Sequence, residues 1–145
     1  MVDKNTVELE NELRRSDNLE EFEEDNAKNF CEYTLPEYLR RLLTEKNLSR
    51  AQVINDSKLG AYAYHIFDGT KKKTSRKNIL SLAFAMKLSP EETNYLLYYA
   101  GHKKLYVRDG WDRTIFFTLN KGYDIDTTNE FLAAKNLSPM LGGVD

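Results

Sequence analysis

The sequence predicts an all-α fold: a compact five-helix domain with additional helices before and after it. Three observations support this prediction. Apolar residues recur at spacings of three and four, which is the spacing of a buried helix face. The sequences TLPE, SRAQ and SPEE each place Glu or Gln three residues after Thr or Ser, as at the start of a capped helix. Glycines follow several of the predicted helices, where a left-handed residue commonly ends a helix.

Composition indicates a globular protein. The chain has 145 residues, of which 41% are hydrophobic and 12% aromatic, enough for a real core. Its single cysteine, Cys31, excludes an internal disulfide and favours a reducing compartment. No apolar run approaches the roughly 18 residues of a membrane span, and the acidic N-terminus lacks the features of a signal peptide. We therefore expect a cytoplasmic protein.

Charge is distributed unevenly along the chain. Residues 1–35 carry a net charge of −7, residues 36–108 of +8 and residues 109–145 of −3, which together give the net −2 of the whole chain. A basic middle block predicts an anionic partner. We favour nucleic acid over the alternative that these lysines only keep the surface soluble.

The acidic N-terminal segment, residues 1–33, is predicted to form one or two helices. Thr6 and Asp17 are possible N-caps. Apolar residues at helical spacing are Leu9, Leu13, Leu19 and Phe22. The segment is either an interaction arm, or an acidic mimic that covers the basic block, or a solvated helix that docks through a few apolar residues. We favour the last interpretation.

Residues 49–69 predict two short helices joined by a tight turn. Ser49 is the expected N-cap of the first helix, in a capping box with Gln52. The Ser/Gly-containing stretch 57–60 is the turn, and Gly69 ends the second helix. Two helices arranged in this way form a helix-turn-helix.

Three further helices complete the five. One begins at Thr34 and runs to about Asn47, one is capped by Thr74 or Ser75, and one begins at Ser89 and ends at Gly101. We therefore assign residues 34–101 to a helix-turn-helix domain.

Residues 102–145 form a C-terminal helical extension. Two more helices are expected there, the first capped by Asp109 or Asp112 and the second by Asp126 or Thr127. The extension is either a dimerisation surface or extra core, and both interpretations stay open.

Five stretches of residues 34–102 carry a resemblance to a known family. They are LPEYLRRLL, LSRAQVI, YAYHIFDG, SRKNILSLAFAMKLS and EETNYLLYYAGH. Together they resemble the helix-turn-helix domain shared by phage Cro and cI repressors and the Xre-like regulators of bacteria. The C-terminal extension is similar to a tail found in a bacterial subgroup, so the resemblance covers about Leu19 to Leu141. It implies a transcriptional regulator that binds double-stranded DNA sequence-specifically as a homodimer.

The resemblance also implies which residues contact DNA. The base-facing positions are Gly60, Ala61, Tyr62, Tyr64 and His65, of which Tyr62 and His65 are expected on the outward face of the second motif helix. The expected phosphate contacts are Arg50, Gln52, Lys71, Lys72, Lys73, Arg76 and Lys77. The base-facing set departs from the family pattern, because it lacks the Arg, Asn or Gln that binds a base edge with two hydrogen bonds.

A second function remains open on the same scaffold, a non-enzymatic protein–protein interaction module. Aromatic side chains beside positive charge, here Tyr62, Tyr64 and His65, suit the centre of a protein interface.

An enzyme is not expected. The only histidines are His65 and His102, and the sequence has no zinc-binding motif, no Gly-rich phosphate loop and no G-x-S-x-G motif. We expect no cofactor and no metal, and we expect His102 to interact with the last carbonyls of the helix that ends at Gly101.

Overall fold

The computed structural model describes residues 6–30, 33–71 and 73–140. Within these ranges the structure contains nine α-helices and one short 3-10 helix and has no strand, which confirms the all-α class. In the same ranges, no helix has the length and apolar character that a bilayer span requires. The contacts divide the chain into two compact units, residues 1–32 and 33–145, which are described separately.

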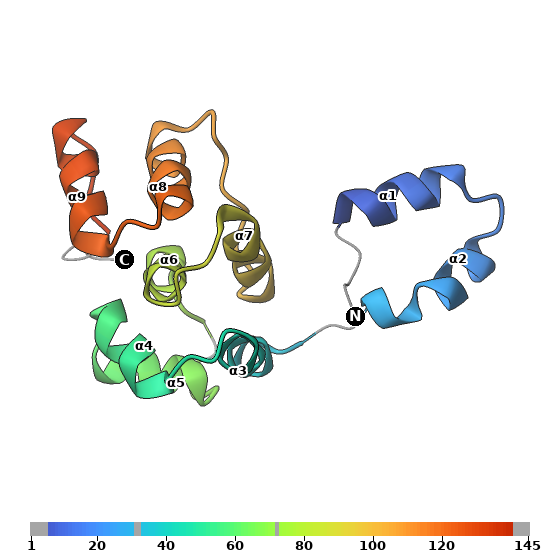
Figure 1. The fold of residues 1–145 in the computed structure, drawn as a ribbon, viewed down its shortest axis with the longest axis horizontal. Helices are drawn as coiled ribbons and strands as arrows, with labels where there is room; N and C mark the ends of the chain where they lie inside the picture. Colours follow the sequence, from blue (N-terminus) through green and yellow to red (C-terminus); the bar gives the residue numbers. More distant parts are fainter. Residues whose placement is uncertain (1–5, 31–32, 72, 141–145) are drawn as a thin grey trace. The chain divides into compact units, whose positions relative to one another are not determined.

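The N-terminal unit consists of α1 (Thr6–Arg15), α2 (Leu19–Asp25) and the 3-10 helix η1 (Ala27–Phe30), shown in blue in Figure 1. Asn18, rather than Asp17, caps α2, and its side chain accepts a hydrogen bond from the Glu21 N–H at 3.0 Å. Thr6 is the first residue of α1 rather than its cap. The ring of Phe22 packs against that of Phe30, with 5.8 Å between ring centroids.

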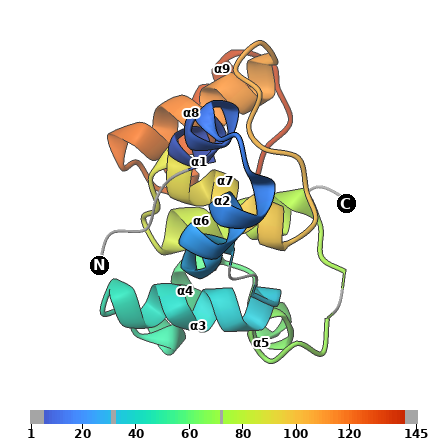
Figure 2. The ribbon, with the colours of Figure 1, turned by 90° about the vertical axis from the view of Figure 1, so that its right-hand side faces the viewer.

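The described residues of the second unit form seven helices, five within residues 34–101 and two after them, as predicted. They are α3 (Leu35–Glu45), α4 (Arg50–Ser57), α5 (Ala61–Phe67), α6 (Arg76–Ala85), α7 (Pro90–Tyr99), α8 (Gly110–Lys121) and α9 (Ile125–Ala134). The chain buries α6 most deeply, and its residues 79–84 are all buried. Figures 1 and 2 show α6 and α7 in the middle of this unit, with α3, α4 and α5 on one side and α8 and α9 on the other.

Local hydrogen bonds explain where these helices begin. Thr34 and Ser89 form the predicted capping boxes, each with the Glu three residues later. At Ser49 only half of the box is observed: Ser49 accepts from the Gln52 N–H, while the Gln52 amide donates to Asp56 at 2.8 Å.

The remaining caps settle the alternatives that the sequence left open. Ser75 caps α6 and Asp109 caps α8. The last helix is present, but its predicted cap, Asp126 or Thr127, is wrong, because Asp124 caps α9 and accepts from the Thr127 N–H at 2.8 Å. Starting the helix there places Ile125 in the core, where it is buried.

Several helices end in a left-handed residue. Gly101 after α7 has a φ of 80°, and the following His102 N–H donates to the Leu97 carbonyl at 2.8 Å. Lys87 after α6 has a φ of 54°, and the following Leu88 N–H donates to the Ala83 carbonyl at 3.0 Å. Both ends have the hydrogen bonding of a Schellman motif, which favours glycine at the left-handed position.

Candidate nucleic-acid interface

The helix pair predicted from residues 49–69 consists of α4 and α5, which pack against each other. Three residues connect them. Lys58 at the end of α4 and Gly60 at the start of α5 both have positive φ, 62° and 60°. Gly60 also has a ψ of −141°, a conformation that is almost restricted to glycine, so a side chain at this position would strain the turn.

The two faces of α5 differ sharply. Ala63, Ile66 and Phe67 are fully buried and anchor the helix in the core. Ala61, Tyr64 and His65 are exposed at spacings of three and four, and we call these three residues the outward stripe. Gly60 is exposed beside them. Four of the five predicted base-facing positions are therefore accessible to a partner.

Tyr62 is the fifth position, and it lies elsewhere. Its ring is half-buried, its hydroxyl donates to Thr74 Oγ1 at 3.3 Å, and Lys71 Nζ lies 5.2 Å from the ring centroid. Tyr62 thus packs against the loop that follows α5. Tyr64, not Tyr62, shares the outward face with His65.

Three of the predicted phosphate contacts are exposed cations, and one of them, Arg50, lies beside the outward stripe. Arg50 begins α4, and its guanidinium lies 5.6 Å from the centroid of the Tyr64 ring. Lys71 and Lys73 are exposed in the loop after α5. Lys72 lies outside the described residues. Gln52 is exposed on α4 but is hydrogen-bonded to Asp56.

Arg76 has a different role from the predicted one. Its guanidinium makes two hydrogen bonds of 2.8 Å to the carboxylate of Asp112 and donates to the carbonyls of Lys103 and Lys104. These contacts join α6 to α8 and to the loop that precedes it. The Arg76–Asp112 pair is largely buried, so the Arg76 guanidinium is not accessible to a DNA phosphate.

Lys77 is also held within the fold. Its ammonium donates to the Pro139 carbonyl at 3.0 Å and lies 5.7 Å from the Trp111 ring centroid. Lys77 therefore links α6 to the residues that follow α9, and it is not among the proposed phosphate contacts.

Two carboxylates lie close to the proposed contacts. Hydrogen bonds from Thr70 hold the pKa of Asp68 below its usual value, and electrostatic interactions with His65 and Arg50 act in the same direction. Asp68 lies 3.9 Å from His65 Nδ1. Asp68 thus places negative charge beside the outward stripe, and Asp56 does so beside Gln52, from which it accepts a hydrogen bond. Both reduce the attraction of the proposed contacts for phosphate.

His102 supports the loop that carries the lysines. Its Nε2 atom lies 2.6 Å from the carbonyl oxygen of Thr74, so the side chain contacts this loop. The sequence had predicted a contact with the terminal carbonyls of α7 instead. Thr74 is therefore held both by His102 and by Tyr62.

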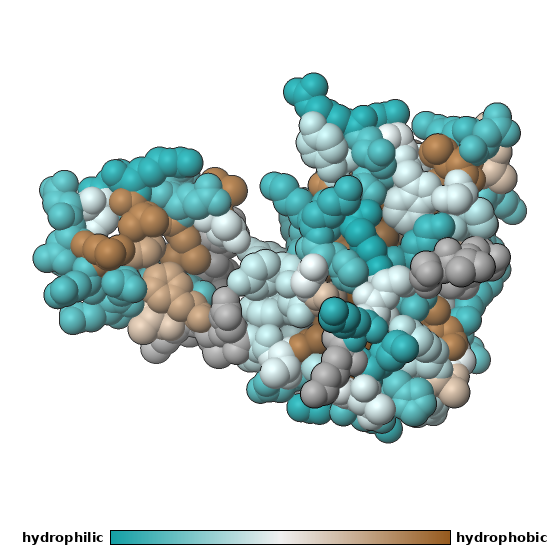
Figure 3. All heavy atoms as spheres, turned by 180° about the vertical axis from the view of Figure 1, so that it is seen from behind, coloured by the Kyte–Doolittle hydropathy of each residue, from teal (hydrophilic) through white to brown (hydrophobic). Residues whose placement is uncertain are grey.

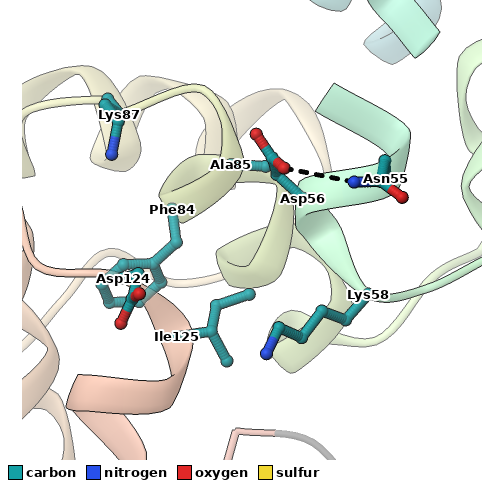
Figure 4. A pocket seen from close by; sticks show the side chains of 8 residues that line it. All are labelled: Asn55, Asp56, Lys58, Phe84, Ala85, Lys87, Asp124 and Ile125. Carbon is teal, nitrogen blue, oxygen red and sulfur yellow. Dashed lines mark hydrogen bonds between the residues drawn. The ribbon is translucent and has the colours of Figure 1, made fainter. Parts of the chain in front are cut away.

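A pocket of about 330 Å³ lies between α4, α6 and the start of α9. Figure 4 shows Lys58 and Lys87 on opposite sides of it, with Phe84 and Ile125 between them. Asp124 and Asp56 also line the pocket, so its charges balance and it has no evident preference for an anion. In the part of the chain that the structure describes, no group of three or more His, Cys, Asp or Glu side chains is placed to hold a metal ion.

Comparison with protein-family models, with curated proteins and with solved structures finds no match for this chain. The resemblance to the Cro/cI and Xre-like regulators stays a prediction that depends on the quoted stretches. The evidence for function is therefore the geometry of α4 and α5 and the positive charge of the unit that contains them.

Proposed function

We propose that this chain is a transcriptional regulator that binds double-stranded DNA through α4 and α5. The observation that carries the proposal is the exposed face of α5, where Ala61, Tyr64 and His65 have no role in the core. Arg50 lies over Tyr64 on this face, and Lys71 and Lys73 are exposed in the loop that follows α5. A helix laid in the major groove with cations on both sides is the arrangement that helix-turn-helix proteins use.

The side chains divide into two roles under this proposal. Arg50, Lys71 and Lys73 bind phosphates, which provides affinity without sequence preference. His65 makes one hydrogen bond to a base edge, Ala61 contacts a thymine methyl group, and Tyr64 offers a flat face. Because none of these makes a two-hydrogen-bond contact with a base, we expect modest sequence discrimination. No catalytic activity and no cofactor form part of the proposal.

The charge of the second unit favours the same partner. The whole chain carries a net charge of −2 and residues 1–32 carry −7, so residues 33–145 carry a net charge of +5. A positively charged domain attracts DNA at long range and accelerates encounter.

Substitution of the proposed phosphate contacts tests this function. The double variant Arg50→Ala with Lys73→Ala should bind a labelled duplex more weakly for every sequence, by roughly tenfold for each lost contact at 0.1 M salt. Lys135→Ala, which removes an exposed cation at the end of α9, is the matched control and should bind like the wild type. Equal losses in both variants would contradict the assignment of this face.

A protein-interaction module using the same face is the second candidate. Arg50 lies over Tyr64 and Asp68 lies beside His65, which is an aromatic and mixed-charge surface of the kind found in protein interfaces. DNA binding with a steep salt dependence favours the regulator, and its absence favours the module.

We further propose that the protein is a homodimer that associates through α8 and α9. Phe117, Tyr123 and Phe131 form an aromatic triad in which all three rings contact one another, with centroid distances of 5.7–6.4 Å. Each side chain is 36–44% exposed. Such a contiguous apolar surface is characteristic of an interaction site.

A second copy of the chain is the occupant that suits this triad. Lys121 lies over the Phe117 ring, and Glu130 is exposed beside Phe131 in α9. A surface that holds both signs of charge allows the opposite charges of two copies to pair, as the self-complementary interface of a two-fold dimer requires. A dimer also presents two copies of α5 to two half-sites on DNA.

A further inference from the structure

The N-terminal unit exposes apolar side chains that its own fold leaves uncovered. Leu13 on α1, Leu19 at the start of α2 and Phe30 in η1 are 42–62% exposed. Leu9 lies one helical turn before Leu13 and is half-buried. Figure 3 shows brown hydrophobic atoms gathered in the middle of the visible face of this unit and bordered by teal hydrophilic atoms. We call Leu9, Leu13, Leu19 and Phe30 the apolar face of the unit.

This unit has almost no core of its own. Among its described residues, Phe22 is the one buried hydrophobic side chain, and α1 buries no residue at all. Units below about 40 residues rarely bury enough surface to fold without a metal, a disulfide or a partner. The favoured interpretation of the sequence, a solvated helix that docks through its apolar residues, leaves open what they dock against.

The charge of the unit identifies the kind of partner. Residues 1–32 carry a net charge of −7, and the run from Glu20 to Asp25 contains five carboxylates. This charge repels a second copy of the same face, as well as nucleic acid and anionic lipid. The charge attracts a positively charged surface, and the exposed leucines require an apolar one. A matching partner surface is therefore apolar in its centre and positively charged at its border.

We propose that the apolar face of the N-terminal unit is a docking surface for a basic amphipathic helix of another protein. Such a helix covers Leu13, Leu19 and Phe30 with its apolar stripe, while its Lys or Arg side chains meet the surrounding carboxylates. The proposal is independent of DNA binding by α4 and α5. It assigns the segment as an interaction arm.

Titration of the full-length chain with designed peptides tests the proposal. The probe is an 18-residue helical peptide with Leu on one face and Lys on the other, and binding is measured by isothermal calorimetry. We expect the Leu/Lys peptide to bind. A peptide with the same lysines but Ser in place of Leu, and one with Glu in place of Lys, should both bind at least about tenfold more weakly, since apolar burial and charge each contribute on that scale. Equal binding of either control peptide overturns the proposal.

Variants of the chain locate the binding surface. Leu13→Ser and Leu19→Ser should each weaken the Leu/Lys peptide by about tenfold, the scale of burying one leucine. Val7→Ser is the matched control, because Val7 is exposed on α1 but lies more than 100° around the helix from Leu9 and Leu13. Unchanged binding in both leucine variants, or an equal loss in the control, overturns the proposal.

A charge variant remains decisive if the leucine variants lose helix by circular dichroism. Glu23→Lys with Glu24→Lys keeps the apolar face and should weaken the same peptide while reducing the salt dependence of binding. Unchanged affinity overturns the proposal. It is also overturned if Leu19→Ser lowers the unfolding midpoint of residues 33–145, which would mean that the chain covers its own apolar face.

Discussion

At the scale of single residues, the largely buried ion pair between Arg76 and Asp112 joins α6 to α8. Asp112 is buried, accepts two hydrogen bonds from Arg76 and a third from the Tyr106 N–H at 2.9 Å. Burial alone would raise the pKa of Asp112. The hydrogen bonds from Arg76 and Tyr106 and the charge of Arg76 outweigh burial, and the pKa lies below its usual value.

We predict that Asp112→Asn lowers the free energy of unfolding by about 3–5 kcal/mol, because it leaves the Arg76 charge largely buried without its partner. Asp126→Asn is the control. It removes an exposed carboxylate paired with Lys58 and should cost less than about 1 kcal/mol. Urea unfolding measures both, and similar losses would contradict the central role of the buried pair.

The lowered pKa of Asp112 also fixes the pH dependence of stability. A carboxyl whose pKa is lower in the folded state stabilises the fold fully above its unfolded pKa of about 4, and this contribution is lost as the pH falls through the folded-state value. Stability of the wild type should therefore fall more steeply below pH 4 than stability of Asp112→Asn. Parallel curves would contradict this assignment.

Lys87 holds a backbone conformation that suits glycine better. We predict that Lys87→Gly raises the free energy of unfolding by about 0.5–1 kcal/mol, because a non-glycine residue in the left-handed region is strained. Lys87→Ala separates this effect from loss of charge and should leave stability nearly unchanged. Gly101→Ala tests the same position after α7 and should cost about 1 kcal/mol, since no atom lies within 4 Å of the added Cβ and the cost is conformational alone.

At the scale of the helices, the outward stripe of α5 is expected to supply whatever sequence preference exists. We predict that His65→Ala reduces discrimination between DNA sites by about 1 kcal/mol, the low end for a base contact, and leaves the salt dependence nearly intact. Tyr64 lies on the same face as His65, so Tyr64→Ala tests the same base contact. Tyr62→Ala should instead lower stability, because the contact with Thr74 is lost. Competition binding with a duplex library measures discrimination. An unchanged preference in both His65→Ala and Tyr64→Ala would contradict direct contact with bases.

Local sequence signals predict most of the helices, but they do not predict contacts between residues that are distant in the sequence. The caps at Thr34 and Ser89 involve residues three apart, so the sequence contains both partners. The start of α9 was misassigned because several capping residues stand side by side, and burial of Ile125 decides among them.

The candidate site shows the same division. Exposure of Ala61 and His65 follows from helical spacing, but the same spacing places Tyr62 and Tyr64 about equally far from the buried face and does not decide which of the two points outward. Arg76 lies in a basic stretch that suggests phosphate binding, but its partner Asp112 is 36 residues away and no local pattern joins the two. The half-buried position of Tyr62 depends in the same way on Thr74, in a loop whose path the sequence does not reveal.

At the scale of the whole molecule, the proposed dimerisation through α8 and α9 would bring two α5 helices to DNA together. We predict that Phe131→Ser and Tyr123→Ser each weaken self-association at least about tenfold, since each removes an aromatic side chain from the interface. Tyr106→Ser, which changes an exposed tyrosine in the loop before α8, should leave it unchanged. Sedimentation equilibrium measures this. A wild type that stays monomeric at all concentrations would contradict the proposed dimer.

The salt dependence of DNA binding by the full-length chain tests the central claim most directly. Arg50, Lys71 and Lys73 supply three described cations per copy, and each phosphate contact contributes roughly 0.9 to the slope of log affinity against log salt. We predict a linear plot with a slope of about −3 for one copy and about −5 for a dimer. Affinity that does not change with salt, or no binding at low salt, would contradict DNA binding and favour a protein-interaction module on the same helices.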